Sequence, residues 1–228
     1  MIAFIGANSW LVERLVPILL EQESICVVGS SRPNYVDTVA ETSRNSLSFV
    51  KTDYASSENV VHHLENHDRL TVVFAGVGTV PGLIANTDQA EVSATVESHI
   101  LFPFSLVSKT LPLMIRAKYG RFIFIGSTEG ARGIVGAGLY TIVKAAQRGL
   151  SRSIAVEYGR FGVTANVMDL GYLGGGQTRH VSKRKQEFLL DATAPRGKVQ
   201  ISDVASTVSY LVSNSSVNGT VVSVDSAG

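Results

Sequence analysis

Cysteine is almost absent from this chain of 228 residues, and charge is sparse. The single cysteine, Cys26, excludes an intramolecular disulfide and a cysteine-based metal cage, and its place in an apolar run predicts a buried, inert thiol. Charged residues make up only 17% of the sequence and the formal net charge is +1, which argues against a general nucleic-acid binder.

Signals that direct a chain into or across a membrane are also missing from the sequence. No charged region followed by a hydrophobic stretch opens the chain, and no continuous apolar run reaches the roughly 18 residues that span a bilayer. We therefore expect a soluble protein without a membrane partner, in a reducing compartment, most simply the cytoplasm.

Apolar residues are abundant, at 45%, and they occur in short runs that alternate with longer amphipathic stretches. Unbroken runs suit strands covered on both faces, and strand alternating with helix predicts βαβ units. The expected strands are 2–5, 25–28, 47–50, 70–74, 122–125, 163–167 and 221–224, and the expected helices are 11–20, 57–67, 89–117, 140–158 and 203–213. The predicted fold is a Rossmann-type, doubly wound parallel α/β sheet of about seven strands with helices on both faces, forming one domain over residues 1–228.

Three residues in the second half of the chain form a pattern suited to proton transfer. Ser127 stands at the carboxyl end of a predicted strand, and Tyr140 opens a predicted helix thirteen positions later. Lys144 follows Tyr140 by four positions, so both side chains project from one helical face. These residue types at this spacing resemble the short-chain dehydrogenase/reductase family, and the resemblance covers nearly the whole chain.

The chemistry explains why these residue types belong together. Hydride transfer at a carbonyl needs an acid/base near neutral pH, and a free tyrosine titrates near 10, so a nearby lysine ammonium must favour the phenolate. The resemblance implies that Tyr140 is the acid/base, that Ser127 binds the reacting oxygen and that Lys144 also holds the nicotinamide ribose. The family's catalytic asparagine aligns with His99. The resemblance implies that this position supports a water molecule in the proton relay, partly through its backbone carbonyl. The alternative is that His99 is simply a packed helix residue.

The first predicted turn resembles a degenerate form of the family's glycine-rich cofactor loop. Gly6 follows the first strand and precedes a helix, where a tight turn directs helix amides at a pyrophosphate. One form of the loop has glycines at 6, 10 and 12; the other, found in nucleotide-sugar members, has them at 6, 9 and 12 with an aromatic residue at 10. Val12 replaces a glycine in both forms. The resemblance assigns cofactor contacts to Gly6, Asn8, Ser9, Trp10 and Leu11.

The end of the second predicted strand favours NADP over NAD. No acidic residue is present there to accept a ribose 2′-hydroxyl, whereas Ser31 and Arg32 offer donors and a positive charge for a 2′-phosphate. The alternative for Arg32 is a solvated side chain in a turn. 

Further cofactor contacts follow from the resemblance alone. Asp53 resembles the residue that meets the adenine edge, with a helix cap for 56–59 as the competing role. Ala75 and Gly76 stand where the family has Ala-Gly, and Gly171 stands where Pro-Gly is usual.

Residues 171–198 interrupt the alternation of strand and helix. A glycine run at 174–176 precedes a mixed, charged stretch, which predicts either a substrate lid or a long surface loop. The family threonine that steadies the carboxamide falls on Gly175, and Thr178 is the substitute.

The sequence thus predicts an NADP-dependent oxidoreductase that acts on a small carbonyl or alcohol, with no metal, and the resemblance implies a homodimer or homotetramer. Two alternatives remain. A regulatory or non-catalytic relative would explain the degenerate loop, and a tailoring enzyme for nucleotide-linked sugars would explain its aromatic form.

Overall fold

Seven parallel strands form one sheet at the centre of the computed structural model, as predicted. The structure describes residues 1–41, 45–76, 82–175, 183–184, 187 and 197–225. The strands lie in the order β3-β2-β1-β4-β5-β6-β7. They are β1 (Ile2–Ile5), β2 (Ile25–Gly29), β3 (Leu47–Lys51), β4 (Leu70–Phe74), β5 (Gly120–Ser127), β6 (Val163–Leu170) and β7 (Val221–Val224).

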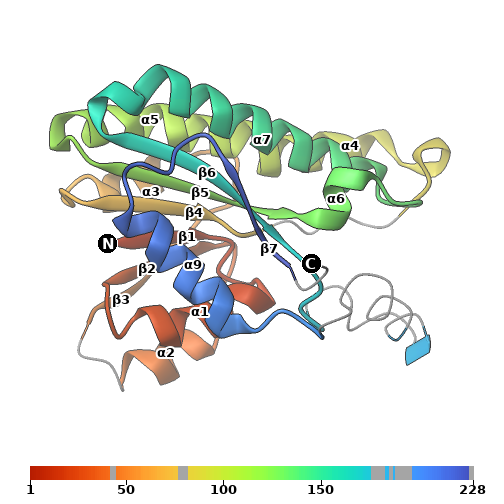
Figure 1. Ribbon diagram of the computed structural model, residues 1–228, viewed down its shortest axis with the longest axis horizontal. Coiled ribbons are helices and arrows are strands. Elements are labelled where there is room, and N and C mark those ends of the chain that lie inside the picture. The colour runs from red at the N-terminus through yellow and green to blue at the C-terminus, as the bar shows by residue number, and fades with distance from the viewer. Residues whose placement is uncertain (42–44, 77–81, 176–182, 185–186, 188–196, 226–228) are drawn as a thin grey trace.

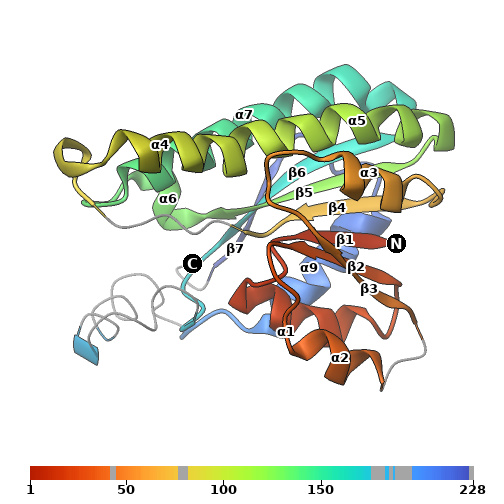
Figure 2. The same cartoon turned by 180° about the vertical axis from the view of Figure 1, so that it is seen from behind.

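Helices cover both faces of the sheet, which confirms the doubly wound Rossmann-type arrangement (Figures 1 and 2). One layer holds α1 (Trp10–Leu19), α2 (Tyr35–Ala40) and α9 (Ile201–Ser213). The other holds α3 (Glu58–Leu64), α4 (Gln89–Val96), α5 (Phe102–Ala117) and α7 (Gly138–Tyr158). The short α6 (Thr128–Arg132) follows β5 directly, and single turns lie at η1 (Ile84–Asn86), η2 (Glu97–Leu101) and η3 (Gly159–Phe161).

The strand order places a topological switch point between β1 and β4. The chain winds outward from β1 through β2 to β3 on one side, and from β4 through β5 and β6 to β7 on the other. Connections therefore leave in opposite directions at this point, and a crevice opens outside the carboxyl ends of the strands, where ligands bind in such folds. In Figure 1 these carboxyl ends point toward α6.

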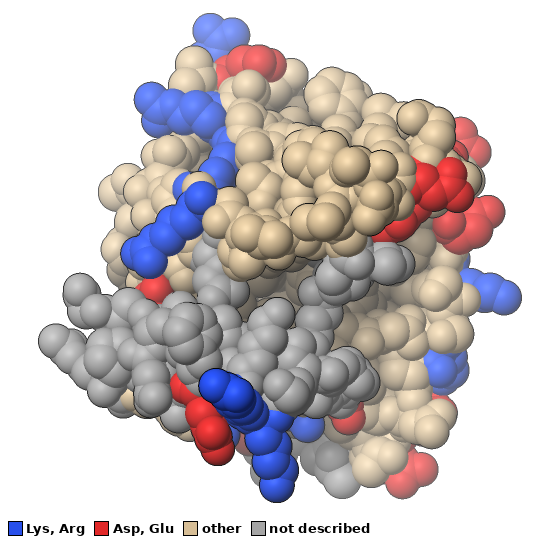
Figure 3. All heavy atoms as spheres, turned by 90° about the vertical axis from the view of Figure 1, so that its right-hand side faces the viewer, with Lys and Arg blue, Asp and Glu red and all other residues tan. Residues whose placement is uncertain are grey.

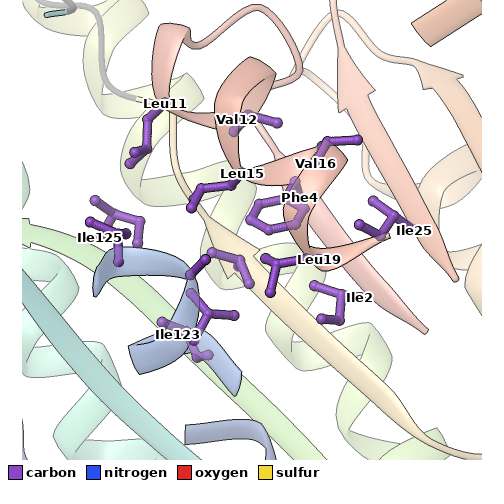
Figure 4. Packing of buried hydrophobic residues seen from close by; sticks show 14 of the residues in the cluster. Ile2, Phe4, Leu11, Val12, Leu15, Val16, Leu19, Ile25, Ile123 and Ile125 are labelled. Atoms are coloured by element: carbon purple, nitrogen blue, oxygen red, sulfur yellow. The ribbon is translucent and has the colours of Figure 1, made fainter. Parts of the chain in front are cut away.

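Helix α1 shows how the apolar pattern builds the core beneath this crevice. The Ser9 hydroxyl accepts a hydrogen bond from the Leu11 amide at 3.3 Å and caps the helix, which therefore starts one residue before the predicted start. Val12 is fully buried, and burial of a valine side chain stabilises a fold by about 1.5–3 kcal/mol. Figure 4 shows the packed face of α1, formed by Leu11, Val12, Leu15, Val16 and Leu19.

Local structure departs from the predicted elements in a π-helical turn and in two short helices, and some element ends differ by a few residues. The stretch predicted as a helix at 89–117 is helical throughout, but its α-helical hydrogen bonding changes to a π-helical turn, η2, at Glu97–Leu101. Apolar periodicity does not reveal such a turn. Helices α2 and α6, of six and five residues, were not predicted because a helix of one or two turns shows too little periodicity.

The stretch Gln89–Ala117 also bears on the expected absence of a membrane segment. By length and composition alone, this stretch is apolar enough to cross a membrane, although polar residues interrupt its apolar runs. Core helices of soluble proteins have the same length and composition, and α5 packs seven buried residues into the core.

Candidate functional site

Two glycines bring the turns after β1 and β4 into backbone contact. Gly6 adopts φ +114°, and a Cβ placed on it would lie 2.6 Å from the Gly76 backbone. The amides of Ala75 and Gly76 both donate to the Ile5 carbonyl, at 2.9 and 3.0 Å. Only glycine allows this conformation and this approach, so the two turns meet at the switch point.

The end of β2 lies beside the same turn. Asn8 Nδ2 donates to Ser31 Oγ at 3.1 Å, which joins two of the predicted cofactor residues. Gly29 makes the approach possible, since a Cβ there would lie 2.8 Å from Ala7 Cβ and from Asn8 Oδ1. The polar atoms of the turn and of the second strand therefore face one site.

Arg32 has a partner that the sequence analysis did not identify. Its Nη2 and Nε donate to Asp37 Oδ1 at 2.6 and 3.1 Å on the exposed surface. The hydrogen bonds from Arg32 lower the pKa of the Asp37 carboxyl. A ligand phosphate would therefore have to compete with Asp37 for the guanidinium.

Trp10 bridges the glycine turn and the segment after β6. The Arg14 guanidinium lies over the indole at 4.2 Å from its centroid. The indole also lies against Gly175. A Cβ on Gly175 would overlap three atoms of the indole ring. The position where the family threonine falls is thus occupied by the edge of an aromatic ring.

The three residues predicted to transfer protons surround Gly130. A Cβ placed on this glycine would lie 2.9 Å from Tyr140 Cε1, 3.4 Å from Lys144 Cγ and 3.4 Å from Ser127 Cβ. Ser127 Oγ accepts a hydrogen bond from the Gly130 amide at 3.2 Å and caps α6. Because Ser127 accepts there, its own proton can be donated to a substrate oxygen.

Lys144 is nearly inaccessible, with 5% of its surface exposed. Its Nζ donates to the Ile125 carbonyl and lies 5.5 Å from the centroid of the Tyr140 ring. Burial lowers the Lys144 pKa to about 7, and the Asp169 carboxylate opposes this by favouring the ammonium.

Asp169 belongs to the site although the sequence analysis missed it. It lies on β6 beside Gly126 of β5, where a Cβ on the glycine would overlap its carboxylate, and it forms an ion pair with Arg148. The available signal was a carboxylate at the carboxyl end of a buried strand, which is rarely placed there without a partner.

Two predicted cofactor residues have structural contacts of their own. Asp53 Oδ1 accepts from the Ala55 amide at 3.0 Å. Helix α3 begins at Glu58 with Ser57 as its N-cap residue, so the alternative of a helix cap by Asp53 is wrong. The Gly171 amide donates to the Val224 carbonyl at 3.0 Å, and the absence of a side chain lets Asp225 pack against it.

His99 and the predicted lid complete the set of candidates. His99 lies on the π turn, where its carbonyl accepts from Gln147 Nε2 at 3.4 Å; Gln147 was also missed from the sequence. Thr178 and most of residues 171–198, the predicted lid, lie outside the residues that the structure describes.

Exposed apolar side chains border the N-terminus of α7, which carries Tyr140. The segment after β4 runs beside the segment before α7, where the Gly82 amide donates to the Gly136 carbonyl at 2.9 Å. The exposed apolar residues of these two segments, here called the apolar rim, are Leu83, Ile84, Ile134 and Val135. Figure 3 views the molecule from this end, where the described surface is hollowed and largely uncharged, with charged residues toward its margins.

Comparison with known proteins finds relatives over most of the chain. Residues 25–226 match a family model described as enoyl-(acyl carrier protein) reductase. The chain is 31% identical over 179 residues to the 3-oxoacyl-[acyl-carrier-protein] reductase MabA of Mycobacterium tuberculosis, covering 76% of this chain and 72% of that protein. It is 26% identical over 216 residues to nodulation protein G of Rhizobium sp., covering 92% and 87%.

Solved structures share the fold. A short-chain type dehydrogenase/reductase from Mycobacterium ulcerans superposes with a TM-score of 0.87 at 21% identity, covering 99% of this chain and 88% of that one. A variant of actinorhodin polyketide ketoreductase, crystallised with NADPH, superposes with a TM-score of 0.84 at 20% identity, covering 99% and 95%.

Proposed function

This chain belongs to the short-chain dehydrogenase/reductase family of oxidoreductases, and from that premise we propose that it is an NADP-dependent enzyme that interconverts a carbonyl and a hydroxyl group. The observation that carries the proposal is the gathering of Ser127, Tyr140 and Lys144 around Gly130. A serine donor, a phenol and a buried ammonium in one place are what proton transfer at a reacting oxygen requires.

The residues at the switch point fit a dinucleotide. Gly6 lets the turn after β1 approach the Gly76 backbone, and α1 begins four residues after this glycine, so its N-terminal amides lie at the switch point. In the proposal this turn holds the pyrophosphate, and Ser31 with Arg32 hold the 2′-phosphate that distinguishes NADP from NAD. NADPH, when bound, supplies the hydride.

In the proposal, the chain's own residues transfer the proton and orient the substrate. Ser127 would donate a hydrogen bond to the carbonyl oxygen and keep its proton, and Tyr140 would transfer its phenolic proton to the same oxygen as charge develops on it. Lys144 stabilises the phenolate that Tyr140 becomes and donates to the nicotinamide ribose. Because Lys144 is buried between α7 and β5, its charge acts on the phenol with little screening by water.

The apolar rim supports a substrate with an apolar chain. Leu83, Ile84 and Val135 are more than half exposed, at 54%, 80% and 90%, and the rim borders the helix start that carries Tyr140. Exposed apolar groups beside a reactive centre are suited to bind an alkyl chain. Since several relatives are named 3-oxoacyl-[acyl-carrier-protein] reductases, we propose a 3-oxoacyl thioester as the substrate class.

The remaining parts of the proposal concern the whole molecule. We propose one domain over residues 1–228, with the segment 171–198 as the substrate lid. A homodimer or homotetramer and a cytoplasmic location follow from the resemblance to the family and complete the proposal.

The direct test is NADPH consumption with a 3-oxoacyl thioester and, in parallel, with an enoyl thioester. We expect turnover of the 3-oxo substrate, at least a roughly 100-fold loss in Tyr140→Phe, and normal turnover in Tyr210→Phe, which changes an exposed tyrosine on α9. Reduction of the enoyl substrate alone would replace carbonyl reduction with double-bond reduction. Equal rates in wild type and Tyr140→Phe would contradict the assigned acid/base.

A second candidate is a regulatory relative that binds ligands without turnover. The contact of Trp10 with Gly175 and the pairing of Arg32 with Asp37 favour it, because both place side chains of this chain where a cofactor would lie. A folded protein that consumes no NADPH with any carbonyl substrate would support this candidate.

A further inference from the structure

Gln147 is a buried polar residue in the second turn of α7 after Tyr140. It follows Lys144 by three positions, so the two side chains share a helical face, and only 4% of its surface is exposed. Burying an amide is costly unless both of its polar atoms are bonded, so its partners indicate why it is there.

The two ends of the amide reach two different elements. Lys144 Nζ donates to Gln147 Oε1 at 3.4 Å, and Gln147 Nε2 donates to the His99 carbonyl at 3.4 Å. An ammonium requires an acceptor and a carbonyl requires a donor, so the orientation of the amide is fixed by its partners. Among side chains of this length, only glutamine supplies both groups without a charge.

We propose that Gln147 is a positioning residue that holds Lys144 for proton transfer by linking its ammonium to the His99 carbonyl. The inference rests on the proposed function. It assigns the contribution of His99 to its main chain, since the carbonyl accepts from the amide on the π turn η2. With two protons of the ammonium directed to Ile125 and Gln147, the third is directed by elimination toward Tyr140 and the ribose.

Few charged groups surround the hydrogen-bonded pair of Lys144 and Gln147. In the part of the chain that the structure describes, Asp169 faces Lys144 from β6, Tyr140 and Arg148 lie on α7 itself, and His99 lies on the π turn. Asp169 is already paired with Arg148, so the neutral acceptor from Gln147 supports the ammonium without adding a second carboxylate to this buried site.

The test measures the titration of Lys144 directly, by NMR of protein labelled at the lysine side-chain carbons, with Lys144→Met used to assign the signal. Gln147→Met keeps length and removes both hydrogen bonds, so we expect the Lys144 pKa to fall by about one unit. Gln147→Glu offers a charged acceptor, so we expect the pKa to rise by at least as much. Ser151→Ala, at a buried position one helical turn further along α7, is the matched control and leaves the titration unchanged.

Turnover supplies the second readout. We expect kcat to fall roughly tenfold in Gln147→Met with little change in KM, and the alkaline limb of its pH profile to move in the opposite direction from that of Gln147→Glu. A purely structural role would lower the melting temperature of both variants without moving the Lys144 titration, and that result overturns the inference.

The NMR titration needs neither cofactor nor substrate. If the wild-type protein shows no turnover, the proposed function fails, and the Lys144–Gln147 link is still judged by the opposite shifts in the two variants. If Gln147→Met does not fold, Gln147→Glu alone decides, because an unchanged Lys144 pKa in that variant contradicts the link.

Discussion

The indole ring of Trp10 lies against the backbone of Gly175, so the turn after β1 and the segment after β6 touch beside the carboxyl edge of the sheet. This contact exists only because position 175 has no side chain. Since Trp10 is the single tryptophan of the chain, tryptophan fluorescence reports on the surroundings of this one indole.

Gly175→Ala is expected to displace the indole, because the new Cβ overlaps the ring. The tryptophan emission should shift to the red as the ring moves into water. Gly149→Ala is the control, since a Cβ there meets nothing within 4 Å, and it should leave the emission unchanged. An unshifted spectrum in Gly175→Ala would show that Trp10 does not rest on this glycine.

Gly130→Ala is expected to damage catalysis without damaging cofactor binding. The new Cβ would lie 2.9 Å from the Tyr140 ring and move the phenol out of place. Because displacements of this size are costly to a reacting geometry, kcat should fall roughly 10- to 100-fold while NADPH affinity changes little. Steady-state kinetics beside an NADPH titration checks this, and a variant with normal kcat would contradict the packing of the three side chains around Gly130.

The pair Arg32 and Asp37 predicts opposite effects of two substitutions on cofactor choice. Arg32→Ala removes the positive charge and should lower NADPH affinity about tenfold, with NADH affinity unchanged. Asp37→Asn weakens the competing hydrogen bonds, which are 2.6 and 3.1 Å long, and should strengthen NADPH binding. Parallel titrations with both nucleotides measure the ratio, and an NADPH preference that neither variant alters would exclude Arg32 from the 2′-phosphate site.

Most of the fold was predictable because its signals are local. The unbroken apolar runs gave all seven strands, and the spacing of Ser127, Tyr140 and Lys144 needed only a strand end and one helical turn. The tight turn at Gly6 was predictable for the same reason, since a glycine directly after a buried strand is typical of such a turn.

Some parts that escaped prediction depend on contacts between distant segments. The role of Gln147 is set by a carbonyl 48 positions earlier in the chain, and that carbonyl lies on a π turn that apolar periodicity does not reveal. A partner of this kind follows from tertiary structure, so residue type and spacing alone do not identify it. The pair of Arg32 and Asp37 escaped prediction for a different reason: the two residues are close in sequence, but Asp37 lies on the six-residue helix α2, which is too short to show periodicity.

Lys144→Met is expected to change how stability depends on pH. In the folded protein the Lys144 pKa is lowered to about 7 from its ordinary 10.5, so between these values the unfolded chain binds more protons and wild-type stability rises with pH. Below about pH 7 both states are protonated and the full cost of burying the ammonium is present.

The variant lacks this group, so it should be more stable than wild type at pH 6, and the difference should shrink as pH rises toward 10. The change amounts to a few kcal/mol, at about 1.4 kcal/mol per pKa unit. Urea unfolding of both proteins across this range measures it. Parallel stability curves for the two proteins would show that burial does not lower the Lys144 pKa.

The central claim is that this chain binds NADP beside a working Ser127, Tyr140 and Lys144 set, and a nucleotide titration tests it most directly. Nicotinamide fluorescence should rise with NADPH at concentrations well below those needed for NADH, and Tyr140→Phe should keep this binding because the phenol serves the chemistry. No binding of either nucleotide at concentrations on the order of 1 mM would contradict the oxidoreductase account and leave the regulatory relative in its place.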